Sequence, residues 1–155
     1  MTLDPWLLLH HTVCGGLAAA GFGVLFNIGF RALPWCAASG ALALAVRTLA
    51  LGSGWSLEAA SFFAALTVGA AVHLLQPRVG IARNAMGVAG CIPMIPGGFA
   101  TRAILGLFAV TAPNHADDGT FVAALESTLR VMFTLGALGT GLAIPSLLLR
   151  VRGIK

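Results

Sequence analysis

Long apolar runs separated by short polar stretches make up almost the whole chain. The runs cover residues 5–27, 33–52, 57–75, 81–111 and 120–149. Each run reaches or exceeds the roughly 20 helical residues that cross the hydrocarbon core of a bilayer. The pattern predicts an all-α integral membrane protein with about five transmembrane helices in a single transmembrane domain, residues 1–155.

The fourth run contains helix-breaking residues near its middle. Its central sequence, Cys-Ile-Pro-Met-Ile-Pro-Gly-Gly, places Pro93 and Pro96 just before Gly97 and Gly98. Proline removes a backbone donor and frees a carbonyl one turn earlier, while glycine permits unusual dihedrals and close backbone approach. This Pro-x-x-Pro-Gly-Gly element predicts one crossing that is broken over residues 92–98 into two half-helices.

A break at membrane depth is tolerated only where protein buries the freed backbone groups or where they line a wet cavity. Transporters use the ends of such half-helices as substrate or ion sites. A proline kink that only shapes helix packing is the alternative interpretation. The sequence leaves both interpretations open.

Small residues recur every four positions in the first run, at Gly15, Ala19 and Gly23, and a continued helix would extend this stripe to Asn27 and Arg31. Residues at this spacing share one helix face, and small side chains there let another helix pack closely. The third and fifth runs carry similar stripes, at Ser61, Ala65 and Gly69 and at Gly136, Gly139 and Gly141. We expect these stripes to exceed the needs of one small bundle, so that a second subunit covers the surplus.

Composition agrees with the hydropathy pattern, because 58% of the residues are hydrophobic and only 9% are charged. These values lie far from those of a soluble domain. The net charge of +4 comes from dispersed basic residues that form no cationic face, so we expect no nucleic-acid partner.

Residue types needed for catalysis or metal binding are few. Cys14, Cys36 and Cys91 lack metal-binding or redox spacing, and the adjacent His10 and His11 point to different helix faces. No catalytic constellation, metal site or phosphate loop can be assembled from the remaining polar residues. We therefore expect neither enzyme activity nor a cofactor.

Basic residues fall in every second connection between the apolar runs, and this pattern predicts how the chain is oriented in the membrane. One side of the membrane would hold Arg31, Arg78, Arg83, Arg150, Arg152 and Lys155, and the other side Asp4, Glu58, His115, Asp117 and Asp118. The positive-inside rule then places the N-terminus outside and the C-terminus in the cytoplasm.

A few charged residues fall inside the apolar runs. Arg47 either extends to the interface beside Trp55 or faces an internal cavity, since a lone intramembrane arginine is costly. Glu126 and Arg130 are four residues apart and can neutralise each other if they face inward.

Arg102 follows the break by about one turn, and the amides of Gly97, Gly98 and Phe99 begin the second half-helix. Guanidinium groups and helix N-termini both bind carboxylates. We therefore expect a substrate carboxylate at these groups. Asn27 and the carbonyls near Ile92, freed by Pro93 and Pro96, would supply neutral polar contacts.

Three stretches together resemble the threonine/serine exporter family. They are Gly21–Asn27 followed by Arg31, then Ile92–Gly97, then Gly141–Pro145, and the likeness spans nearly the whole chain. In particular it looks like the short membrane subunit of the split form, in which a second, larger subunit supplies the other half. One departure is Gly29, where family members often have proline.

The resemblance implies a bacterial inner-membrane exporter that moves small hydroxy amino acids out of the cytoplasm, coupled to an ion gradient. In some split systems it implies export of dicarboxylates such as succinate. The expected partners are the larger subunit, a small-molecule substrate and membrane lipid. A structural subunit that anchors the transport subunit without contacting substrate is the alternative.

Overall fold

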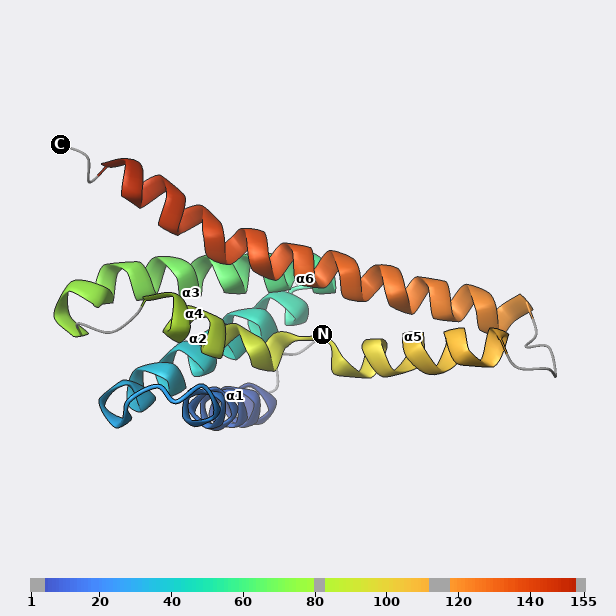
Figure 1. Cartoon of the computed structure of the whole chain (residues 1–155), viewed down its shortest axis with the longest axis horizontal. Coiled ribbons are helices and arrows are strands. Elements are labelled where there is room, and N and C mark those ends of the chain that lie inside the picture. Colours follow the sequence, from blue (N-terminus) through green and yellow to red (C-terminus); the bar gives the residue numbers. More distant parts are fainter. Residues whose placement is uncertain (1–4, 80–82, 112–117, 153–155) are drawn as a thin grey trace. The chain divides into compact units, whose positions relative to one another are not determined.

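The computed structural model describes residues 5–79, 83–111 and 118–152, and within these ranges every regular element is a helix (Figure 1). The α-helices are α1 (Pro5–Leu25), α2 (Leu33–Gly52), α3 (Leu57–Val79), α4 (Arg83–Cys91), α5 (Gly97–Val110) and α6 (Asp118–Arg152), and the short 3₁₀ helices are η1 (Phe30–Ala32) and η2 (Ile92–Met94).

Four of these helices are long and apolar enough to cross a membrane, or five crossings result if the bent pair around the break is one span. The predicted all-α membrane fold with a broken fourth segment is confirmed. Of the residues that predicted orientation, Asp4, His115, Asp117 and Lys155 lie outside the described residues.

The chain divides into two compact units. Unit one comprises Met1–Met94 and Ala137–Lys155, and unit two comprises Ile95–Gly136. Helix α6 contributes its C-terminal part to unit one and its N-terminal part to unit two. Each unit is described by itself below.

Glycines bring α1 and α2 of unit one into close contact. A Cβ placed on Gly40 would lie 2.5 Å from the carbonyl oxygen of Gly15, and one on Gly16 would lie 3.1 Å from that of Ala37. The stripe predicted at Gly15, Ala19 and Gly23 is buried along its length. It is therefore a packing face, and its neighbour is α2 of the same chain.

The stripes of α3 and α6 meet in the same way within unit one. A Cβ on Gly141 would lie 2.6 Å from the Phe62 carbonyl oxygen, and one on Gly69 would lie 3.0 Å from that of Leu142. The prediction that these stripes are surplus for a second subunit is thus wrong for Gly15, Gly23, Gly69 and Gly141. Each of them already packs inside the chain.

Local capping signals set the ends of two helices. The amide of Ala59 donates to the Ser56 hydroxyl at 3.2 Å, so Ser56 caps α3 as its sequence position suggests. Helix α1 ends at Leu25, earlier than the expected residue 27, because Asn27 takes a left-handed conformation with φ of 54°. The small-residue stripe therefore does not continue to Asn27 or Arg31.

Many small side chains lie in the core of unit one, together with a few larger ones such as Met94 and Val68, and many large apolar side chains face outward. Ala43, Ala64 and Ala65 are fully buried, whereas Leu17 is 69% exposed. This distribution suits a membrane, where close backbone approach holds helices together and large apolar side chains meet lipid.

Replacing Gly40 with alanine should destabilise unit one by on the order of 1–3 kcal/mol, because the new methyl overlaps the α1 backbone. Gly21→Ala is the matched control, since a Cβ on Gly21 meets no heavy atom within 4 Å. Thermal unfolding of the detergent-purified variants measures both effects. Equal stability of the two variants would contradict the described α1–α2 contact.

Candidate functional site

The break separates two helices through a short irregular stretch. Helix α4 ends at Cys91, η2 adds Ile92–Met94, and α5 begins at Gly97. The Gly97 amide donates to the Ile95 carbonyl at 2.8 Å, and the Ala100 amide donates to the Pro96 carbonyl at 3.0 Å. The first helical acceptor of α5 is therefore Pro96.

The Met94 carbonyl receives its donor from another helix. Nη1 of Arg47, in α2, donates to this oxygen at 2.6 Å. In an unbroken helix the donor would be the amide four residues further on. The Arg47 side chain thus replaces a missing backbone hydrogen bond, rather than extending toward Trp55.

Ser39 fixes the first half-helix to the same face of α2. Its hydroxyl lies 2.8 Å from the Cys36 carbonyl oxygen and 3.1 Å from the Met86 carbonyl oxygen in α4. Gly90 permits this approach, because a Cβ there would lie 2.5 Å from Ser39 Oγ. Ser39 and Arg47 are eight residues apart, so both reach α4 and η2 from one face of α2.

Charged and aromatic side chains gather in unit two around Phe99. The guanidinium carbon of Arg102 lies 6.0 Å from the centre of the Phe99 ring, and that of Arg130 lies 5.5 Å from it. Close packing of α5 on the N-terminal part of α6 permits this, since a Cβ on Gly106 would lie 2.6 Å from Ala124 Cβ.

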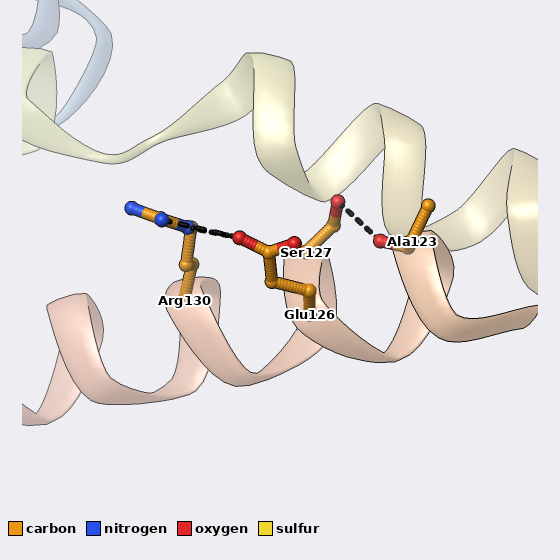
Figure 2. A network of polar contacts seen from close by, with 4 residues as sticks. All are labelled: Ala123, Glu126, Ser127 and Arg130. Atoms are coloured by element: carbon orange, nitrogen blue, oxygen red, sulfur yellow. Dashed lines mark hydrogen bonds and ion pairs between the residues drawn. The ribbon is translucent and has the colours of Figure 1, made fainter. Parts of the chain in front are cut away.

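Glu126 and Arg130 form the ion pair that their spacing suggests. Nε and Nη2 of Arg130 each lie 3.1 Å from Oε1 of Glu126 (Figure 2). The Arg130 side chain is 42% exposed and that of Glu126 is 63% exposed. The pair therefore neutralises itself but lies on the surface of unit two.

The first turn of α5 offers accessible backbone donors. Gly97 and Gly98 are exposed, and a Cβ on either would meet no heavy atom within 4 Å. The amides of Gly98 and Phe99 find no backbone acceptor among the described residues, as expected for the start of a helix. This end can therefore receive an anion without displacing protein atoms.

The predicted site residues fall into two sets. In unit two, Phe99 and Arg102 lie on α5, the helix that Gly97 and Gly98 begin, and Glu126 and Arg130 lie on α6. The two arginines meet at the Phe99 ring, and Glu126 pairs with Arg130. Pro96 caps that helix. The other predicted residues, Asn27, Arg47, Ile92 and Pro93, belong to unit one.

Asn27 has a conformational role. Its amide donates to the Val24 carbonyl and the Ile28 amide donates to the Gly23 carbonyl, both at 2.9 Å. Together with the positive φ of Asn27, these bonds form the Schellman motif that ends many helices. Asparagine suits this position because it tolerates the left-handed region better than other residues with a side chain.

Sequence reasoning missed a contact between α1 and α2. Nδ1 of His11 lies 3.2 Å from the hydroxyl oxygen of Thr48. The signal was present, because His11 precedes Gly15 by four residues and so extends the stripe that packs on α2. Among the described residues, no group of three or more His, Cys, Asp or Glu side chains is placed to hold a metal ion.

A family model described as threonine/serine exporter, ThrE, matches residues 11–148. No solved structure matches the chain.

Arg47→Met should destabilise unit one by about 1–3 kcal/mol, because it leaves the buried Met94 carbonyl without a donor. Arg47→Lys should recover most of the loss, since the contact is a single bond that an ammonium can also make. Thermal unfolding in detergent compares the two. A lysine variant as unstable as the methionine variant would show that packing of the guanidinium, not its hydrogen bond, is what matters.

Proposed function

Because the chain belongs to the threonine/serine exporter family, we propose that it is a membrane subunit of a secondary exporter and contributes part of the substrate site. Its break is the observation that supports this role. The break leaves two backbone donors at the start of α5, and Arg102 and Arg130 lie against the side chain of Phe99 in the same turn.

The proposed site binds the substrate carboxylate at the amides of Gly98 and Phe99 and at Arg102. Helix N-termini and guanidinium groups both favour negative charge, and their hydrogen bonds to an anion are stronger than neutral ones. Arg102 has no ion pair among the described residues, so its charge is available to a substrate.

The charges of unit two bear on the choice of substrate. Threonine and serine carry an ammonium as well as a carboxylate, and the ammonium would compete with Arg130 for Glu126. A dicarboxylate such as succinate instead matches two guanidinium groups; Arg102 and Arg130 both lie by Phe99, and the second carboxylate would compete with Glu126 for Arg130. We propose threonine and serine as the first substrates to test and succinate as the second.

A purely structural subunit is the alternative function. One observation favours it: Arg47 already satisfies the Met94 carbonyl, so this side of the break needs no ligand. A scaffold of this kind would anchor the transport subunit without touching substrate. Transport by site variants separates the two proposals.

The proposed partner is a larger subunit of the same family. Support comes from the Glu126–Arg130 ion pair of unit two, whose side chains are 63% and 42% exposed. Charged side chains at membrane depth normally face protein or a water-filled cavity. A second subunit over this surface would shield the pair from lipid.

Substituting alanine for Gly97 and Gly98 together should reduce export by at least about tenfold while leaving folding intact. The methyl groups meet no protein atom, yet they obstruct a substrate that must approach the backbone. One charge-assisted hydrogen bond contributes on the order of 1.5–3 kcal/mol, which sets this magnitude. The measurement is counterflow of labelled threonine, serine and succinate in liposomes that hold the chain with its partner.

Arg102→Gln should give the same loss of counterflow, and Gly21→Ala serves as a neutral glycine control. Normal transport by stably inserted variants at all three site positions would exclude this substrate site. The structural role would then be the better proposal.

The proposed orientation has the N-terminus outside and the C-terminus in the cytoplasm. It places Gly29 on the cytoplasmic side and Ser53 outside, and both residues are exposed. Single cysteines at these positions, in a Cys14→Ala background, should react with an impermeant maleimide from opposite sides. Labelling of Ser53→Cys only from the cytoplasmic side would show that the orientation is the reverse of the proposed one.

A further inference from the structure

Three charged side chains of unit two meet around one aromatic ring. The guanidinium carbons of Arg102 and Arg130 lie 6.0 Å and 5.5 Å from the centre of the Phe99 ring, and Arg130 also pairs with Glu126. The charges lie well inside their helices, since Arg102 follows the start of α5 by five residues and Glu126 follows the start of α6 by eight. Charged residues at membrane depth are costly and commonly mark a substrate or ion pathway.

The ion pair between Glu126 and Arg130 uses one oxygen of the carboxylate. Nε and Nη2 of Arg130 both lie 3.1 Å from Oε1 of Glu126 (Figure 2). Among the described residues, no hydrogen-bond donor meets Oε2, and the Glu126 side chain is 63% exposed. Each oxygen of an ionised carboxylate is a hydrogen-bond acceptor. Oε2 is therefore available to a donor from a ligand.

We propose that Glu126 binds the ammonium group of the substrate through Oε2 and thereby selects α-amino acids over dicarboxylates. This inference rests on the proposed function, because it adds a second contact to a substrate whose carboxylate is placed at Arg102 and at the amides of Gly98 and Phe99. An α-amino acid carries both charged groups on the same carbon atom. Its ammonium therefore needs a negative group close to the carboxylate site, and Glu126 is the carboxylate that contacts this cluster among the described residues.

The two classes of substrate make different demands on the ion pair. An ammonium competes only mildly with Arg130 for Glu126, because it can donate to Oε2 while Arg130 keeps Oε1. A second carboxylate would need the Arg130 guanidinium, which Glu126 already occupies, and it would lie beside a group of the same charge. Repulsion between like charges is stronger away from bulk water. The ion pair therefore admits a zwitterion and opposes a dianion.

Phe99 connects the two proposed contacts of the substrate. Its amide is one of the donors for the substrate carboxylate, and its ring attracts the guanidinium of Arg130, which in turn holds Glu126. Close packing keeps α5 beside α6 at this level, because a Cβ on Gly106 would lie 2.6 Å from Ala124 Cβ. The positive and negative groups of the proposed site are thus held around one residue.

The first test compares threonine and succinate counterflow in proteoliposomes that hold the chain with its partner. Glu126→Gln removes the charge but keeps the shape of the side chain and an acceptor for Arg130. It should lower the ratio of threonine to succinate transport by at least about tenfold, the effect of losing one charge-assisted hydrogen bond. Arg130→Gln should raise the same ratio, because it removes the guanidinium that a second carboxylate needs. Glu58→Gln, in the first turn of α3, is the matched control.

A purely structural ion pair predicts a different result. Either substitution would then break the same contact, so Glu126→Gln and Arg130→Gln would change the ratio in the same direction or leave it unchanged. Each of these outcomes would overturn the proposal.

The second test removes the ammonium from the ligand instead of the charge from the protein. The probe is β-hydroxybutyrate, which is threonine without its amino group, used to inhibit the counterflow of labelled threonine. With the unaltered chain it should inhibit at least about tenfold more weakly than unlabelled threonine. With Glu126→Gln the two compounds should inhibit equally. The same difference in both chains would show that the ammonium meets another group, contrary to the proposal.

Arg102→Gln distinguishes failure of this proposal from failure of the proposed function. Loss of counterflow in Arg102→Gln together with an unchanged ratio in Glu126→Gln contradicts only the role of Glu126. Normal counterflow of both substrates in Arg102→Gln removes the carboxylate site itself, and the role of Glu126 falls with it.

Discussion

The hydrogen bond from Arg47 to the Met94 carbonyl is the interaction on which the rest of unit one depends. Hydrocarbon offers no water to a freed backbone group, so a break inside a membrane needs an internal donor. Helix α2 supplies that donor two turns after Ser39, which contacts the Met86 carbonyl. Both contacts require α4 to lie close to α2, and Gly90 permits it by leaving room for Ser39. Glycine contacts between α1 and α2 then fix the position of α2 itself.

The two sides of the break differ in whether their backbone groups find a hydrogen-bond partner within the protein. Upstream, the acceptor at Met94 is satisfied by protein. Downstream, the amides of Gly98 and Phe99 find no backbone acceptor among the described residues. Donors without acceptors, beside Arg102, which has no ion pair among the described residues, form an environment that favours negative charge. This asymmetry is the reason for proposing an anionic group at this end of α5 and none at Met94.

Signals that act within one segment could be predicted from the sequence. The apolar runs and the Pro93–Gly98 break depend only on neighbouring residues, and the structure places them where expected within a few residues. Contacts between segments could not be predicted in this way. Periodicity shows that Arg47 lies within a helix but not which carbonyl it meets, and a stripe of glycines does not identify its neighbour. The same limit hid the meeting of Arg130 with Phe99 and that of His11 with Thr48.

Because its donor is a side chain, the hydrogen bond at the break can open without unwinding a helix, which a backbone hydrogen bond within a helix cannot do. A helical N–H group is fixed by its own chain, so its hydrogen bond opens only when the helix unwinds. The Arg47 guanidinium is held by a flexible side chain and a single bond to Met94. It can leave this carbonyl by rotamer change alone, without unfolding α2 or α4, and can return in the same way. Loss of this hydrogen bond would therefore leave α2 and α4 helical, and its free-energy cost would be that of the unpaired Met94 carbonyl, about 1–3 kcal/mol.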